Sequence, residues 1–319
     1  MNFLRKLLVV SLVFLLSAGH ALAAISKVSV AQIIDNDDLN AVRSGLLDGL
    51  EAKGYEPGKN LEFTYALADG KPAKAAKIAR KLASDNPHVL VGIATPTAQA
   101  LVSATRSIPI VFTAVTDPIS ARLVKQLDKP RQNVTGLSDL SPVAQHVSLI
   151  REILPDTNTI GVVYNPAEAN AVAIIKLLRT VTKSFGITLR EETVLSASDV
   201  ERKTKILAKQ SDVIYGLTDN TVGSGVDGLM RAANQASTPV VAGALFYVDK
   251  GAIAGIVLDY YNVGVQTAEY VAAILDGQEP SELSVKTAQS SQLVVNLDAA
   301  RELGVTVPQS VIDRAIVSR

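Results

Sequence analysis

Short apolar runs alternate along most of the chain with segments of helical periodicity. Runs of strand length, rich in β-branched residues, occur at residues 27–34, 61–66, 88–93 and 110–115. The segments between them carry apolar residues three and four positions apart, as amphipathic helices do. Strand and helix in alternation favour a parallel sheet covered on both faces by helices. A sheet of this kind binds ligands at the carboxyl ends of its strands.

The alternation stops near residues 133–136 and then starts again. Further apolar runs predict strands at residues 160–164, 187–195, 213–217, 251–257 and 292–296. The sequence therefore predicts an α/β protein with two doubly wound parallel-sheet lobes joined by a multi-strand hinge. We expect the lobes to divide the chain as follows: residues 24–136 with 246–276 in lobe 1, and residues 137–245 with 277–319 in lobe 2.

A proline-containing polar turn follows the run at residues 88–93. Thr95 is expected to cap the next helix, and Pro96 suits its first position because an N–H there has no intrahelical partner. Thr97 and Ala98 would follow in the first turn. The free N–H groups and positive end of such a helix favour an anion.

Three other predicted strands end in similar polar turns. These turns are Thr116-Asp117-Pro118, Asn165-Pro166 directly after Tyr164, and Thr218-Asp219-Asn220. A helix cap would explain any one of these turns alone. Because two turns fall in each half of the chain, facing lobes would direct all four into one cleft.

Acidic and aromatic residues near these turns have two readings each. The acidic residues that could bind an amine or merely cap the following helix are Asp117, Asp219 and Asp259. The aromatic residues that could stack on a planar ligand or pack in a core are Tyr164, Phe246 and Tyr260. The pattern alone leaves both readings open.

The amino-acid composition argues against several kinds of functional site. The chain has no cysteine and only three histidines, so thiolate metal sites, cysteine nucleophiles and histidine clusters are poorly supplied. Arg5 and Lys6 precede an apolar run at residues 7–16, and residues 21–23 fit a cleavage signal. We therefore expect residues 1–23 to be a signal peptide and the mature protein to lie in the periplasm. Its net charge of −2 gives no sign of a nucleic-acid partner.

Residues 223–228 match the glycine pattern of dinucleotide sites, and this match raises the alternative of a nucleotide-using enzyme. That fingerprint needs its first glycine directly after a strand, so that the helix end meets the pyrophosphate. Here residues 218–222 separate the predicted strand from Gly223. The spacing argues against a nucleotide site.

Several segments together resemble the substrate-binding proteins of ABC importers, in particular the family with tryptophan- and tyrosine-binding members. They are ATPTAQAL, IPIVFTAVTDP, NVTG, VVYNP, the TDN turn and GIVLDYYNVGVQTAEYVAAILDG, and the likeness runs from about Val28 to Ala315. The resemblance implies a type I periplasmic binding fold with three crossover strands. It also implies a small ligand, an amino acid with an aromatic side chain, and a membrane permease as partner. The chain departs from the family at Asp37-Asp38, where a His-Pro pair is common.

Taken together, these features predict a non-enzymatic binding protein without cofactor or metal, acting as a monomer. We expect the turn from Thr95 to Ala98 to hold the ligand carboxylate, and Asp219 or Asp259 to pair with its ammonium group. Whether Thr116 and Asp117 touch the ligand or only shape the wall stays open. A periplasmic ligand sensor would use the same cleft, so the sequence does not separate sensor from transporter.

Overall fold

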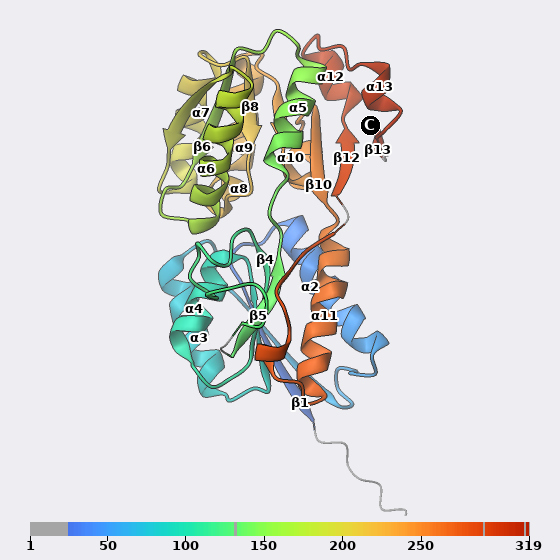
Figure 1. Ribbon diagram of the computed structural model, residues 1–319. Coiled ribbons are helices and arrows are strands. Elements are labelled where there is room, and N and C mark those ends of the chain that lie inside the picture. The colour runs from blue at the N-terminus through green and yellow to red at the C-terminus, as the bar shows by residue number, and fades with distance from the viewer. Residues whose placement is uncertain (1–24, 131–132, 290, 316, 319) are drawn as a thin grey trace, which may run out of the picture.

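The computed structural model describes residues 25–318 except 131–132, 290 and 316. The predicted signal peptide, residues 1–23, lies outside the described residues. The described chain forms two α/β lobes, one above the other in Figure 1, which confirms the predicted fold class. None of its helices combines the length and the apolar character that crossing a membrane requires.

Lobe 1 is built on a six-stranded sheet with the order β11-β5-β4-β3-β1-β2. All its pairings are parallel. The strands are β1 (Ser26–Gln32), β2 (Leu61–Leu67), β3 (Val89–Ile93), β4 (Ile110–Val115), β5 (Val134–Ser138) and β11 (Lys286–Thr287). The helices of this lobe are α2 (Asp37–Ala52), α3 (Pro72–Ser84), α4 (Thr95–Ala104) and α11 (Tyr260–Leu275), with the short η2 (Pro280–Glu282).

Lobe 2 is built on a seven-stranded sheet with the order β13-β12-β10-β9-β8-β6-β7, in which only β10 and β12 pair antiparallel. Its strands are β6 (Thr159–Tyr164), β7 (Thr188–Thr193), β8 (Val213–Gly216), β9 (Val240–Ala242), β10 (Ala254–Leu258), β12 (Ser291–Val295) and β13 (Val317–Ser318). Its helices are α5 (Val143–Ile153), α6 (Ala169–Ser184), η1 (Ala197–Asp199), α7 (Val200–Ala208), α8 (Asn220–Ser224), α9 (Val226–Gln235), α10 (Leu245–Asp249), α12 (Leu297–Glu302) and α13 (Gln309–Ile312).

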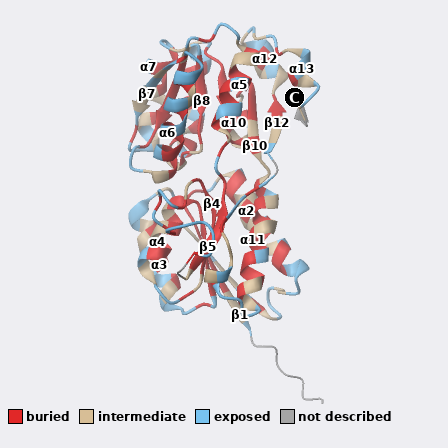
Figure 2. Cartoon of the chain, viewed as in Figure 1, coloured by how far each residue is buried: buried red, intermediate tan, exposed pale blue. Residues whose placement is uncertain are grey.

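The central strands carry apolar runs because helices cover both faces of each sheet. Every residue of β3, β4 and β8 is buried, whereas the edge strand β7 alternates exposed and half-buried residues. Figure 2 shows the same distribution, with buried residues concentrated in the strands and on the inner faces of the helices. Two-sided burial of this kind is typical of parallel sheets.

The chain crosses between the lobes three times. The first crossing directly follows β5 and lies close to the expected boundary at residue 136, but the other two crossings lie elsewhere than we expected. Strand β10 falls in the segment assigned to lobe 1 but pairs with β9 and β12 of lobe 2. Strand β11 falls in the segment assigned to lobe 2 but pairs with β5 of lobe 1. An apolar run specifies a buried strand without naming its neighbours, which is why the boundary could not be read from the pattern.

The crossings follow β5, β10 and β11 directly and lie between the two lobes in Figure 1. Two of them touch, since the Ala288 N–H donates to the Ser138 carbonyl at 2.7 Å. The crossing after β10 is connected to the crossing after β5 as well, since the Tyr260 hydroxyl at the start of α11 donates to Asp139 Oδ2 at 2.9 Å. The hinge is therefore a bundle of connected segments and not a single linker.

Helix α11 is fastened to α2 by close approach of the two backbones. A Cβ atom built on Gly264 would lie 2.1 Å from the Val42 carbonyl oxygen, and one built on Gly45 would lie 2.0 Å from that of Tyr261. Glycine is needed at both places because any side chain would push the helices apart. The segment after β10 is thereby fixed to lobe 1 as soon as it leaves lobe 2.

We expect Gly264→Ala to lower the free energy of unfolding by about 2 kcal/mol, although alanine is the better helix former, because overpacking a tight contact costs about 1–3 kcal/mol. Urea unfolding followed by circular dichroism measures the change. Glu269→Ala, at an exposed position of the same helix, serves as the control and should stay close to wild type. Equal stability of Gly264→Ala and wild type would contradict the close contact.

Candidate functional site

A cavity lies between the lobes where the carboxyl ends of strands from both sheets meet. We call it the inner cavity. Lobe 1 contributes Asp38, Thr95 and Thr116 among others, the crossings contribute Asp139 and Tyr260, and lobe 2 contributes residues that include Asn170, Thr218, Asp219, Asn220 and Phe246. Both lobes are thus needed to form it.

Unpartnered polar atoms converge on the inner cavity. Among the described residues, buried side-chain oxygens without a hydrogen-bond partner occur in six residues, and five of these line this one cavity. The five atoms are Asp38 Oδ2, Thr95 Oγ1, Asp139 Oδ1, Asn170 Oδ1 and Thr218 Oγ1. Buried polar groups are otherwise nearly always paired, so this convergence marks a place where a polar ligand supplies the missing partners.

The lining carries three carboxyl groups and no basic side chain. Burial raises the pKa of Asp38 to about 7, partly offset by the backbone amides of Phe246 and Leu245 from the opposite lobe. Burial likewise raises the pKa of Asp139, against the hydrogen bonds of Tyr260 and Thr116. Charged carboxylates are therefore disfavoured here until a cationic group joins them.

Asp219 differs from the other two acids because both of its oxygens already have partners. Oδ1 accepts from the Val222 N–H at 2.9 Å, which caps α8, and Oδ2 accepts from the Asn165 N–H at 2.6 Å. Burial and the charge of Glu168 raise the pKa of Asp219. These two bonds to backbone N–H groups hold the Asp219 side chain in place. Asp219 therefore stabilises the turn after β8 and also lines the cavity.

Glu168 and Asn170, at the start of α6, organise the lobe 2 wall. Glu168 Oε1 accepts from the Thr221 N–H at 2.9 Å, and its Oε2 accepts from Asn220 Nδ2 at 2.6 Å. Asn170 Nδ2 donates to the Thr218 carbonyl at 2.9 Å, which leaves Oδ1 facing the cavity without a partner. No local sequence signal singles out these residues, since their partners lie about 50 positions away.

The structure brings six of the predicted site residues to the inner cavity. They are Thr95, Thr116, Asp219, Asn220, Phe246 and Tyr260. Pro96 and Asn165 instead line a neighbouring space, the outer cavity, which lies between α3 and α4 of lobe 1 and residues 165, 167, 168, 195 and 221 of lobe 2. Phe246 stacks on Tyr247 with ring centroids 4.2 Å apart.

Five predicted site residues line neither cavity, and each has a structural partner. The Thr97 hydroxyl donates back to the Ile93 carbonyl, and the Ala98 N–H donates to the Ala94 carbonyl at 3.1 Å. Asp117 accepts from the Ser120 N–H at 2.9 Å, and Asp259 accepts from the Asn262 N–H at 3.0 Å as the N-cap of α11. Tyr164 packs in the lobe 2 core.

The turn before α4 also differs from the expected cap. The helix begins at Thr95, and the capping residue is Ala94 with a φ of 77°. An alanine rarely adopts a left-handed conformation. Because Ala94 takes the cap position, the Thr95 hydroxyl is not used by the helix and stays without a partner in the cavity.

Sequence reasoning missed Asp38 and Asp139, which both follow strands. Asp38 lies in the acidic cluster after β1, at the point where the chain departs from the related family, and Asp139 directly follows β5. The rule that polar residues at strand ends face a cleft applies to both. Both lie outside the four turns that the sequence pattern singles out, since Asp38 stands in an acidic cluster before a helix and Asp139 lies next to the expected lobe boundary at residue 136.

The glycine pattern at residues 223–228 is not placed to hold a nucleotide. Gly223 lies inside α8, and Gly225 and Gly228 belong to the start of α9, so none of them forms the turn directly after β8. Among the described residues, no group of three or more acidic or histidine side chains is arranged to hold a metal ion.

A polar cavity formed jointly by two hinged lobes defines a bilobed solute-binding protein. The chain belongs to the family of ABC transporter substrate binding proteins, whose family model matches residues 27–318. It is 31% identical over 277 residues to a tyrosine-binding protein of Clostridioides difficile. The aligned region covers 87% of this chain and 80% of that protein. Its function is therefore to clamp a small solute between its lobes for an ABC importer.

Two solved structures at similar identity show which lobe arrangement is present. An ABC domain from Streptococcus pneumonia in complex with L-Trp matches with a TM-score of 0.90 at 31% identity, covering 93% of this chain and all of that one. A ligand-free, open substrate binding protein from Clostridium difficile matches with a TM-score of 0.71 at 32% identity, covering 92% and 99%. Because identity and coverage are nearly equal, the lobes lie closer to the arrangement of the ligand complex.

We expect Asp38→Asn to make the ligand-free protein more stable than wild type at about pH 8. Asp38 has its pKa raised from 3.8 to about 7, so its stabilising contribution is complete below about pH 4 and is lost as the pH rises through 7. Removing the charge should gain at least about 1 kcal/mol at pH 8 and nothing at pH 4. Thermal unfolding at the two pH values measures this.

Asp37→Asn is the matched control, because Asp37 is the exposed neighbour of Asp38 at the start of the same helix. It should show a much smaller pH-dependent gain, because the charge of Asp37 contributes only slightly to the raised pKa of Asp38. A stability gain for Asp38→Asn that is the same at both pH values would show that burial of the charge is not the cause.

Proposed function

We propose that the protein binds a single amino acid with an aromatic side chain in the interlobe site and delivers it to a membrane permease. The observation that carries this proposal is the convergence of five unpartnered polar atoms on a cavity with three carboxyl groups and no basic side chain. Such a lining favours a ligand with an ammonium group and several hydrogen-bonding atoms. Relatives named for tyrosine and crystallised with L-Trp support the same ligand class.

Asp139 and Asp38 are the carboxylates best placed to bind the ammonium group of the ligand. Each has one oxygen without a partner in the cavity, and they come from a crossing and from lobe 1 respectively. Asp219 lies on the same cavity but already accepts two backbone N–H groups, and Asp259 lies away from it. An ammonium beside these carboxylates would form charge-assisted hydrogen bonds in a site closed to water.

The start of α4 is best placed to bind the ligand carboxylate. The Thr95 hydroxyl has no partner there, and the first N–H groups of a helix lack intrahelical acceptors. The Ala98 N–H is not one of them, since it donates to Ala94. The positive end of the helix adds a favourable field for an anion.

Closure would follow from contacts that only the closed form offers. A ligand held by Thr95 and Asp38 of lobe 1 and by Asn170 or Thr218 of lobe 2 bridges the lobes. It then favours the closed population by its differential affinity for that state. Membership of the ABC transporter family supports an importer over a sensor, and we infer that the protein acts in the periplasm as a monomer.

A thermal-shift screen against the common amino acids, followed by calorimetry, tests the ligand assignment. We expect L-tryptophan or L-tyrosine to raise the unfolding temperature, because a ligand bound only by the folded state stabilises it by mass action. Indole-3-propionate, which lacks the ammonium group, should give no shift. Stabilisation by the acid alone, or by none of the aromatic amino acids, would refute the assignment.

We expect Asp139→Asn to weaken amino acid binding at least tenfold without lowering stability. Removing one member of a buried charge pair costs about 2–5 kcal/mol, whereas the asparagine keeps an acceptor for the Tyr260 hydroxyl. Calorimetric titration measures the affinity. Asp117→Asn is the control, because Asp117 accepts from the turn at Ser120 and lies outside both cavities. Unchanged affinity in Asp139→Asn would remove that residue from the site.

Affinity should also rise with pH between about 5 and 7. Below its raised pKa of about 7, Asp38 is protonated in the free protein and must lose its proton to pair with an ammonium group. Binding should therefore release protons, at a limit of tenfold in affinity per pH unit for each proton released. Titrations in two buffers of different ionisation enthalpy measure the proton count. Proton uptake, or an affinity that falls with pH, would contradict this linkage.

A further inference from the structure

The inner cavity is too small for an aromatic ring. Its volume is about 40 Å³, which is room for roughly three water molecules. A cavity that admits benzene has a volume of about 150 Å³. The inner cavity therefore suits the ammonium and carboxylate groups of an amino acid but leaves its side chain to be placed elsewhere.

The outer cavity adjoins the inner one and is much larger. Its volume is about 470 Å³. Three pairs of consecutive residues line the two spaces, one member facing each: Ile34 and Ile33, Thr95 and Pro96, and Asn220 and Thr221. Since the Cα atoms of neighbouring residues lie about 3.8 Å apart, the two cavities adjoin at these three places.

The lining of the outer cavity suits a flat apolar group. Apolar residues of both lobes line it, among them Ile33, Pro96 and Ala100 of lobe 1 and Leu195 of lobe 2. Arg80 and Glu168 are the charged residues of the lining. A guanidinium group stacks well on an aromatic face. Leu195 is 74% exposed, the largest exposure among the large hydrophobic residues described, so it is not part of either core.

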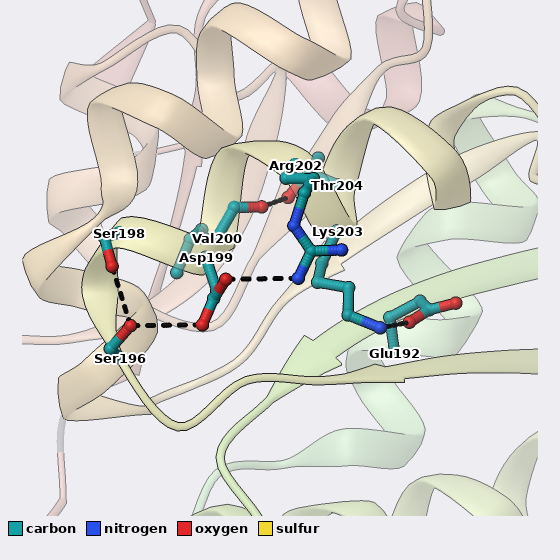
Figure 3. A network of polar contacts seen from close by, with 8 residues as sticks. All are labelled: Glu192, Ser196, Ser198, Asp199, Val200, Arg202, Lys203 and Thr204. Carbon is teal, nitrogen blue, oxygen red and sulfur yellow. Dashed lines mark hydrogen bonds and ion pairs between the residues drawn. The ribbon is translucent and has the colours of Figure 1, made fainter.

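The segment that carries Leu195 is anchored and not a loose tip. The next residue, Ser196, donates from its hydroxyl to Asp199 Oδ2 at 3.2 Å and lies 2.8 Å from the Ser198 hydroxyl. Arg202 holds the other oxygen of Asp199 at 3.1 Å, as Figure 3 shows. An exposed leucine at a position fixed in this way can form one wall of a binding site for an apolar group.

We propose that the side chain of the bound amino acid lies in the outer cavity, between α4 and Leu195, while its ammonium and carboxylate groups occupy the inner cavity. This inference rests on the proposed function and adds to it a second subsite that selects for a large, flat side chain. Leu195 and Ala100 are then specificity residues, contributed by opposite lobes. A large side chain would also contact both lobes and add to the preference for closure.

The chain contains no tryptophan, so bound L-tryptophan can be observed by its own fluorescence in the intact mature protein. Leu195→Ala should weaken L-tryptophan binding about threefold and shift its emission to longer wavelength, because the ring becomes more exposed to water. Ala100→Leu, which fills the cavity from α4, should weaken binding at least tenfold. Thermal unfolding of each variant without ligand shows whether its fold is intact.

Matched controls lie outside both cavities. Leu177→Ala removes an exposed leucine from α6, and Ala52→Leu makes the larger substitution at the exposed end of α2. Both should keep wild-type affinity and emission. If Leu195→Ala and Ala100→Leu fold and also leave affinity and emission unchanged, the outer cavity is not the side-chain subsite, while the proposed function stands. If wild type binds no aromatic amino acid, both proposals fall.

Discussion

The closed arrangement of the lobes depends on how buried polar atoms in the interlobe cavity find partners. Closing the lobes removes Asp38, Asp139 and Asn170 from water without giving each of their oxygens a hydrogen bond. A buried polar group left unpaired costs about 1–3 kcal/mol. A ligand that pairs with these atoms removes this cost in the closed form alone. Ligand binding therefore stabilises the closed form relative to the open one.

The hinge is placed so that the crossings carry part of this site. Asp139 follows β5 and Tyr260 follows β10, and the hydrogen bond between them joins two crossings at the cavity wall. The contact of α11 with α2 through Gly45 and Gly264 fixes the next segment to lobe 1. The hinge can then turn at a few residues while each lobe moves as a packed unit.

Charge and shape are divided between two adjacent spaces. The inner cavity is small and contains three carboxyl groups and five unpartnered oxygens, while the outer cavity is larger and is lined in part by the apolar Ile33, Pro96 and Leu195. In the binding mode that we propose, this division separates recognition of the groups that all amino acids share from recognition of the side chain. It also explains why the aromatic residues near the cleft, such as Phe246 and Tyr260, need not be the ones that stack on a ligand.

The sequence by itself determined the two α/β lobes, the polar turns at strand ends and six of the residues that line the inner cavity, because burial and helix capping are local requirements. Only the tertiary structure decided which strands are neighbours, so it moved β10 and β11 to the opposite lobes from those expected. It also decided which oxygens are already satisfied. Thr97, Asp117 and Asp259 bond to their own turns, while one oxygen of Asp38 and one of Asp139 stay without a partner. Whether an oxygen bonds to its own turn or faces the cavity without a partner is decided by how the packed lobes place the strand ends, and no local pattern contains that information.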